Sequence, residues 1–585
     1  MTVTSISSQF HGRETNTFGG GTAPRPALWR WRIDGPISVA LLLVTLLVLL
    51  HATSPTFFPF VFPDEFEFAW QSKQLHDGRL PYADFFSFLP LGSLTMGSLA
   101  LHVIGPTIFA LRIGTTCWVA LATIVAYATF LELSGSRSLA LSATLWIPLI
   151  FFPYWPLASH HWLAMLPGIG AVGLAAFATR RSKGDYLAGT SGFMAVAAIS
   201  MIQSDGAAYF ASALAVLMLR HIDDEEPSAS TRRARRGARR SLAVTIRRMS
   251  YAAWHTGETR AGHRDLLGGV PKVGTRISFR SAISFAAGAA LATLVTVIHA
   301  LVIGVAPEAF RSTVLWPLQS YRQSGGFNDL GLNDFLQTAW LRHTMQPANG
   351  WVVGLVFLAV ILMVLAFAVT DIVRVFRRAP RRTLAGPLIA VVVALIYFAG
   401  RTDWNHLVFL GPTLLIVGAA SCQRQRVRLA TLSAAAAMGV LVSGMGWVSV
   451  LGDTDGYLRA SADEILRSAS LAAVLDRYSA LSSPEVPIVA LGIHASELYF
   501  YHAPKPPPVS WLDKPEHRYN DPIQYDTVAQ FLRDQKIPYL IVDEWSAYTA
   551  DPNMLLSRVL TEDYVPCDVW RDRTVAAQRG SPCPG

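Results

Sequence analysis

The sequence predicts a polytopic α-helical membrane protein with about eleven transmembrane helices and a C-terminal extracytoplasmic α/β domain. Composition is the first observation: 52% of the 585 residues are hydrophobic and 15% are charged, whereas soluble domains average about 25% charged. The mean hydropathy is +0.35. Order along the chain is the second observation: membrane-length apolar runs recur up to residue 450, after which charge rises and apolar runs shorten.

The predicted transmembrane segments are apolar runs of roughly the 17 to 25 residues that cross a bilayer. They lie near 37–54, 107–131, 138–153, 161–179, 186–202, 206–221, 281–305, 349–373, 384–400, 405–421 and 428–450. The stretch 91–105 is apolar too, but Gly and Pro bound it. We interpret it as a re-entrant or interfacial segment.

The basic residues predict the orientation. With a cytoplasmic N-terminus, the inner loops hold Arg180, Arg181, Lys183 and the runs TRRARRGARR (231–240), RVFRRAPRR (374–382) and RQRVR (424–428). Cytoplasmic loops are enriched in Arg and Lys, which favours this orientation. The net charge of +9 therefore reflects topology. The run at 231–240 has no interleaved aromatic residues, so it argues against a nucleic-acid partner.

This orientation divides the chain into a cytoplasmic tail (1–36), a transmembrane domain (37–450) and an extracytoplasmic domain (451–585). The transmembrane domain has a first outer loop at 55–106, a second at 306–348, and between them a basic cytoplasmic loop at 222–280, which we expect to be partly disordered.

Two apolar runs in the C-terminal part, EVPIVALGI (485–493) and IPYLIVDEW (537–545), are typical of buried strands. TVAQFLRDQK (527–536) predicts the helix that leads into the second strand. Cys567 and Cys583 would pair if this part faces an oxidising compartment, and the sequence leaves that open.

Polar residues beside the apolar segments gather on the predicted outer side. They are Asp64, Glu65, Glu67 and Asp84 of the first loop, His160 and His161 in SHHW, Asp205 in QSDG, Glu308, Arg311, Tyr321, Arg322 and Arg342 at 307–348, and Arg401, Asp403 and His406 in GRTDWNH. Ionisable residues in membrane proteins face cavities rather than lipid, so this gathering predicts one wet cavity at the outer leaflet.

Each motif also has a purely structural interpretation. Pro63 followed by Asp64 and Glu65 is typical of a helix N-terminus. The two histidines suit a membrane interface, QSDG and PYADF suit turns, and Arg401 with Asp403 suits an ion pair that closes a loop. Each of these alternatives stays open for its own motif. Taken together they are weaker, because they do not explain why all of the motifs fall on the same side of the membrane.

The order of these motifs resembles the GT-C superfamily of polytopic glycosyltransferases, especially the protein mannosyltransferase and aminoarabinose transferase branch. The motifs are DEFEFAWQSKQLHDGRLPYADF (64–85), SHHW (159–162) and GRTDWNH (400–406). The likeness covers about 37 to 450 and, weakly, the C-terminal part. It implies transfer of a hexosyl or pentosyl group from a polyprenyl-phosphate sugar to an acceptor hydroxyl, with inversion.

The same resemblance implies residue roles. Asp64 would be the general base, and Glu65 would position acceptor, donor or a nearby basic group. The lipid phosphate needs cationic donors, for which Arg401 and His406 come first and Arg311 and Arg322 second. The other implied substrate-binding residues are Asp84, His160, His161, Asp205, Asp403, Trp70 and Tyr82.

The resemblance implies no required cofactor, because a lipid phosphate leaves without a metal, although carboxylates with histidines would suit a divalent cation. The expected partners are the lipid-linked sugar, a glycan, lipid or protein acceptor, and the bilayer of the cell membrane. Two alternatives differ in class. A transporter or flippase for a lipid-linked or anionic solute predicts polar residues through the whole bilayer. A non-catalytic envelope-assembly protein would use the outer domain for binding.

Overall fold

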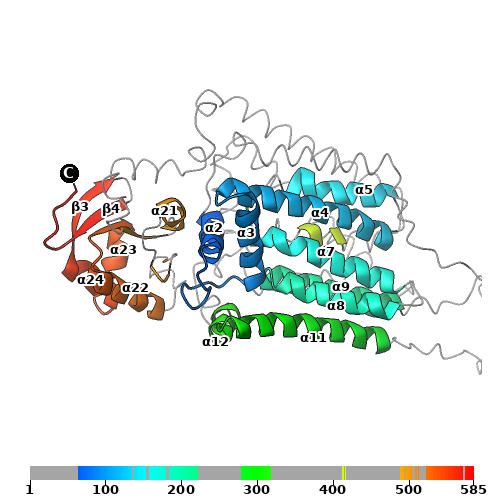
Figure 1. The fold of residues 1–585 in the computed structure, drawn as a ribbon. Helices are drawn as coiled ribbons and strands as arrows, with labels where there is room; N and C mark the ends of the chain where they lie inside the picture. Colours follow the sequence, from blue (N-terminus) through cyan, green and yellow to red (C-terminus); the bar gives the residue numbers. More distant parts are fainter. Residues whose placement is uncertain are drawn as a thin grey trace, which may run out of the picture.

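The structure, a computed structural model, places a helical bundle on one side and a sheet with its helices on the other, with helices α2 and α3 between them (Figure 1). It describes residues 63–134, 137–152, 157–179, 184–221, 279–317, 411–413, 415–416, 488–492, 495–502, 507–509, 512, 522–570 and 573–584.

The bundle helices lie side by side with roughly parallel axes (Figure 1). They are α4 (Ile108–Ser134), α5 (Arg137–Trp146) with its π-helical continuation η2 (Ile147–Phe151), α7 (His160–Ala178), α8 (Gly184–Ile199), α9 (Gln203–His221) and α11 (Phe279–Val302). Small residues let them approach closely, as in many membrane bundles. A side chain at Gly288 of α11 would overlap the carbonyl oxygen of Gly189 in α8.

Three helices of the described part are long and apolar enough to cross a membrane: Ile108–Ser134, His160–Ala178 and Arg280–Val302. They match the predicted segments at 107–131, 161–179 and 281–305. The predicted segments at 138–153, 186–202 and 206–221 coincide with α5 and η2, α8, and α9.

The remaining predicted segments lie outside the described residues, as do the N-terminal tail and almost all of the basic loop 222–280. These segments are 37–54, 349–373, 384–400 and 428–450, together with most of 405–421. The total of about eleven spans therefore stays a prediction.

Helices α2 (Pro63–His76) and α3 (Leu91–Ile104) lie across one end of the bundle (Figure 1). Helix α2 begins at Pro63, as the Pro and the following acids predict. Helix α3 has 14 residues, so it is about 21 Å long. That is shorter than the roughly 30 Å hydrocarbon core, which agrees with an interfacial segment. The short helix α12 (Ala306–Phe310) and the π-helical turn η4 (Arg311–Leu315) follow α11.

The C-terminal unit is built on a four-stranded sheet of order β1-β2-β4-β3. Its strands are β1 (Ile488–Leu491), β2 (Tyr539–Asp543), β3 (Tyr564–Trp570) and β4 (Arg573–Gln578). Strands β1 and β2 are parallel, and the other pairs are antiparallel. Helices α21 (Ala495–His502) and α22 (Pro522–Gln535) separate β1 from β2, and α23 (Trp545–Thr549) and α24 (Leu555–Asp563) separate β2 from β3. The predicted runs 485–493 and 537–545 thus contain β1 and β2.

Strands β1, β2 and β4 are buried on both faces of the sheet, to which their alternate residues point, whereas β3 is largely exposed. One face packs on α22 and α24, and its core includes Val489, Leu540, Val528, Leu532 and Val559. The other face packs on α2 and α21, and its core includes Ile488, Ala490, Ile541, Val575, Trp70 and Tyr499. Helix α2 therefore belongs to the core of the C-terminal unit as well as to the end of the bundle.

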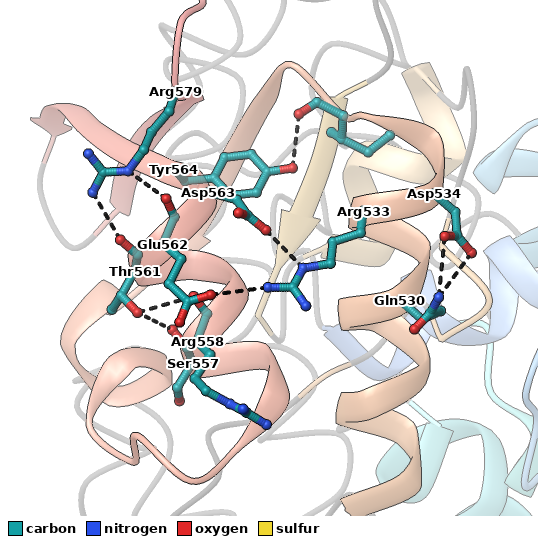
Figure 2. Close-up of polar contacts among 11 residues, drawn as sticks. Gln530, Arg533, Asp534, Ser557, Arg558, Thr561, Glu562, Asp563, Tyr564 and Arg579 are labelled. Carbon is teal, nitrogen blue, oxygen red and sulfur yellow. Dashed lines mark hydrogen bonds and ion pairs between the residues drawn. The ribbon is translucent and has the colours of Figure 1, made fainter.

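Two surface arginines, one on α22 and one after β4, form hydrogen bonds with the end of α24 (Figure 2). Arg533 of α22 donates to Asp563 at 2.9 Å and to Glu562 at 3.2 Å. Arg579 donates to the backbone carbonyl of Glu562 at 2.6 Å, at the end of α24. The Tyr564 hydroxyl donates to the carbonyl of Ile537 at 2.9 Å, and burial raises the pKa of Tyr564 above its ordinary value.

Cys567 of β3 and Cys583 of the final segment form a disulfide. The structure thereby answers the question that the sequence left open about these two thiols. Disulfides form and persist mainly in oxidising compartments. The bond therefore suits a C-terminal unit outside the cytoplasm.

Candidate functional site

The candidate site lies at the end of the bundle that α2 and α3 cover (Figure 1). Hydrogen bonds bring four segments together there: the first turn of α2, the residues just before α7, the start of α9, and η4. These segments carry most of the described candidates on the predicted outer side. The structure thus gathers residues that are far apart in the sequence.

Glu65 is held by a buried arginine. The Arg112 side chain of α4 donates from Nε to Oε1 at 2.8 Å and from Nη2 to Oε2 at 2.5 Å. The backbone N–H of Ala158, just before α7, donates to the same Oε1 at 2.8 Å. Glu65 therefore joins three segments, and its carboxylate is committed to that junction.

Arg112 was not among the residues predicted for the site. Its signal in the sequence is a single charge near the start of an otherwise apolar segment, IFALRIGTT. Charged side chains in such segments are costly and usually face a partner or a cavity. That signal marks Arg112 as functional or structural, but it does not identify Glu65 as the partner.

His161 and Asp205 form a second buried pair. The Nδ1 atom of His161 lies 2.9 Å from Oδ2 of Asp205 at the start of α9. An ionised carboxylate can only accept, so with Asp205 ionised Nδ1 would carry the proton and the pair would orient the ring. His160 packs against His161, with ring centroids 4.5 Å apart. Ser159 caps α7 by accepting from the His161 N–H at 3.3 Å.

The segment after α11 contacts this region. The Gln203 amide donates to the carbonyl of Thr313 at 3.0 Å and to that of Phe88 at 3.3 Å. Trp316 stacks on Phe88 with centroids 5.4 Å apart. Arg311, at the start of η4, is exposed. These contacts place Arg311 in a turn that borders the site.

Three predicted substrate-binding residues have structural contacts in this structure. The exposed Asp84 accepts from the Leu80 N–H at 2.7 Å, which is the turn alternative for PYADF. Tyr82 has a φ of +69°, and its buried hydroxyl donates to the Leu89 carbonyl at 2.6 Å. Trp70 is fully buried between Phe85 and Tyr499, so its ring has no open face on which a sugar could stack.

Glu67 lies on α2 two residues beyond Glu65 and is also buried. It accepts hydrogen bonds from Gln71 of the same helix and from Ser496 of α21. Ser87 donates to the Gln71 amide oxygen at 2.6 Å, which fixes the direction of that amide. Glu67 thus faces the C-terminal unit.

Several predicted residues fall beyond what the structure describes. Asp64 is the second residue of α2, but its side chain is not described. Arg322, Arg401, Asp403 and His406 lie outside the described residues, as do Tyr321 and Arg342. Within the part of the chain that is described, no group of three or more His, Cys, Asp or Glu side chains is arranged to hold a metal ion.

No protein-family model and no curated protein matches the sequence. The solved structure of ArnT from Cupriavidus metallidurans bound to undecaprenyl phosphate is similar, with a TM-score of 0.50 over 94% of this chain and 99% of that chain. The chain has the GT-C fold. At 11% sequence identity the likeness establishes the fold alone.

A second solved structure, the oligosaccharyltransferase of Archaeoglobus fulgidus in complex with Zn and sulfate, is 11% identical, with a TM-score of 0.42. It covers 90% of this chain and 71% of that chain. A likeness at this score carries no inference about the site.

Within this GT-C fold, the described residues bring Glu65, His160, His161 and Asp205 to one end of the bundle, with Arg112 as an unpredicted member. The two buried pairs suit different roles, one structural and one chemical. The Glu65–Arg112 pair has its charges compensated and anchors α2. The His161–Asp205 pair presents a fixed imidazole, a group that binds anions or relays protons.

Proposed function

We propose that the chain is a membrane glycosyltransferase that moves a sugar from a polyprenyl-phosphate donor to an acceptor hydroxyl. The observation that carries the proposal is the convergence of the first turn of α2 with the Glu65–Arg112 and His161–Asp205 pairs at one end of an apolar bundle. The GT-C fold supports it, and the undecaprenyl phosphate bound to ArnT favours a lipid-linked donor.

The reaction would take place on the extracytoplasmic face of the cell membrane. The Cys567–Cys583 disulfide supports an oxidising location for the C-terminal unit. Helix α2 packs directly on that unit, through Trp70 and Tyr499, which supports the assignment of Asp64 to the same face. The proposed orientation, with a cytoplasmic N-terminus, agrees with the basic inner loops.

Asp64 is the proposed general base. Its carboxylate takes the proton of the acceptor hydroxyl while that oxygen attacks the anomeric carbon. The bond from the anomeric carbon to the phosphate oxygen breaks, the configuration inverts, and the polyprenyl phosphate leaves with the bonding electron pair. A general base acts only from within hydrogen-bond reach, so the placement of α2 matters as much as the acid itself.

Glu65 is a positioning residue in this proposal. Its carboxylate already accepts from Arg112 and from the Ala158 N–H, so it fixes the first turn of α2 against α4 and α7. A carboxylate so engaged is poorly suited to take a proton, because protonation would break these charge-assisted bonds.

Cationic donors would stabilise the leaving phosphate. His160 and His161 are the described candidates, with Asp205 holding the His161 ring, and Arg311 is proposed from η4, which Gln203 of α9 contacts through the Thr313 carbonyl. Arg401, His406 and Arg322 are proposed for the same task, and Asp403 for orienting Arg401. Developing negative charge is best stabilised by donors that are already in place.

The test is turnover by the purified protein in lipid nanodiscs with polyprenyl-phosphate sugars. Asp64→Asn should lower transfer by about 10²- to 10⁴-fold, the usual contribution of a general base, and leave donor binding intact. Asp534→Asn, an exposed carboxylate on α22, is the matched control. Wild-type turnover by Asp64→Asn would overturn the base assignment. Movement of the lipid-linked donor across the bilayer without transfer would favour the flippase alternative.

The transferred group can be named from cells. Mass spectrometry of the envelope glycans and glycoproteins of a deletion strain should show the loss of one sugar residue. Complementation with the Asp64→Asn variant should leave that residue missing, whereas the Asp534→Asn variant should restore it.

A further inference from the structure

Helix α2 is anchored on two sides by two of its own carboxylates. Glu65 joins it to the bundle through Arg112 and Ala158. Glu67 joins it to the C-terminal unit through Ser496 of α21, which lies 429 residues further along the chain. Residues two apart on a helix point in different directions, so the two anchors together fix both the position and the rotation of α2.

The Glu67 anchor is a small buried network. Gln71 donates to Oε1 of Glu67 and Ser496 donates to Oε2, so each carboxylate oxygen has its own donor. Ser87 donates to Gln71, which aligns the amide toward Glu67. The side chains of Ser496 and Ser87 are 1% and 0% exposed. A buried carboxylate is tolerated only with such donors, so the network holds α2 and α21 at a set distance.

Aromatic contacts surround this network. Phe66 meets Phe500 edge-to-face at 6.0 Å, and Trp70 lies 6.2 Å from Tyr499. Phe86 of the first loop donates its N–H to the Pro508 carbonyl at 2.9 Å. These contacts make the junction between α2 and the C-terminal unit buried and closely packed.

Helix α21 is itself fixed to the sheet. The Tyr499 hydroxyl donates to the Ala490 carbonyl at 2.7 Å and accepts from the Ala490 N–H at 2.9 Å. Burial raises the pKa of Tyr499 above its ordinary value, so the hydroxyl keeps the proton it donates. Strand β1 lies at an edge of the sheet, where one row of backbone N–H and C=O groups has no neighbouring strand. The Tyr499 hydroxyl takes the place of such a strand at Ala490.

A helix of 14 residues is marginal on its own, so α2 depends for its geometry on its apolar packing and on these two anchors. Asp64 is the second residue of that helix and adjoins Glu65. Without the Glu67 anchor α2 could rotate about its axis, and that rotation would move its first turn relative to the histidines of α7. A misplacement of about 1 Å at a reacting group can lower a rate about 10²-fold.

We propose that Glu67 and Ser496 are a positioning pair through which the C-terminal unit fixes α2, making that unit part of the catalytic apparatus. The proposal rests on the proposed function for its catalytic consequence, because Asp64 is the base. The mechanical part, in which Ser496 restrains α2, stands on the contacts alone.

The experiment compares Ser496→Ala with Ser557→Ala in the full-length protein in nanodiscs. Ser557 is the matched control, because it is as buried as Ser496 and donates to the Tyr548 carbonyl at 2.5 Å within the C-terminal unit, away from α2. Two readouts are taken: hydrogen exchange of the backbone amides of residues 63–76, and kcat and KM for transfer from a polyprenyl-phosphate sugar.

Ser496→Ala should speed exchange in 63–76 by about tenfold and lower kcat by about tenfold or more, with KM for the donor nearly unchanged. Ser557→Ala should leave both readouts at the wild-type level. Unchanged exchange and kcat in Ser496→Ala, or equal losses in both variants, would overturn the proposal. If the wild-type protein transfers no sugar, the proposed function is overturned. If exchange is then still faster only in Ser496→Ala, the conclusion that Ser496 restrains α2 stands.

Discussion

Replacing Arg112 with Met should strongly destabilise the protein, because it strips two charge-assisted hydrogen bonds from the buried Glu65 carboxylate. Both side chains are almost completely buried, at 4% and 0% exposed. Removing one partner of a buried ion pair typically costs about 3–5 kcal/mol, since the other charge stays buried. At 1.4 kcal/mol per tenfold, this corresponds to a shift of about 10²- to 4 × 10³-fold in the unfolding equilibrium.

A double-mutant cycle separates the pair from its surroundings. Glu65→Gln with Arg112→Met removes both charges while keeping the side-chain volumes, so the double variant should lose clearly less stability than the sum of the two single losses. The coupling between two residues in direct contact lies in the range of about 0.5–3 kcal/mol, and we expect the upper end here. The measurement is denaturant unfolding of the purified protein in micelles, followed by tryptophan fluorescence.

Arg533→Met is the control for this cycle. Arg533 also contacts two carboxylates, but its side chain is 41% exposed, so its loss should cost less than about 1 kcal/mol. The reasoning about Glu65 fails if Arg112→Met costs no more than Arg533→Met. It fails equally if the double variant is as unstable as the sum of the single ones, because the pair would then have no coupling.

Two further predictions concern the histidine pair and the disulfide. Asp205→Asn should lower kcat for sugar transfer by about 10- to 100-fold, because it removes the ionised acceptor that orients His161; a kcat equal to that of the wild type would exclude the orienting role. Reducing Cys567–Cys583, whose cysteines are 16 residues apart, should remove about 3 kcal/mol of stability from the C-terminal unit, which is checked by thermal unfolding with and without a reductant. The double variant Cys567→Ser/Cys583→Ser should not respond to the reductant, and a stability unchanged by reduction of the wild type would contradict the estimate.

Features determined by local sequence were predictable. The start of α2 follows from Pro63 and the acids after it, because a helix N-terminus is set by a few neighbouring residues. Strands β1 and β2 follow from short apolar runs bounded by polar residues. The helices at 108–134 and 160–178 follow from their length and hydropathy.

The partners of the site residues were not predictable, because pairing across the fold leaves no local pattern. Glu65 and Arg112 are 47 residues apart, and a lone arginine in an apolar run does not say which acid it meets. Trp70 and Asp84 show the reverse problem. A tryptophan near a predicted cavity suits sugar binding as well as packing, and only the sheet face opposite Trp70 decides for packing.

The shared core of α2 and the sheet also sets an order of events during synthesis. Glu67 and its partner Ser496 are separated by 429 residues, and a ribosome adding roughly 5–20 residues per second needs about 20–90 s to make that stretch. During that interval the apolar side of α2, with Trp70, has no sheet to cover it. The segment around α2 is therefore exposed to aggregation and proteolysis in the newborn chain, until the last strands are made and cover it.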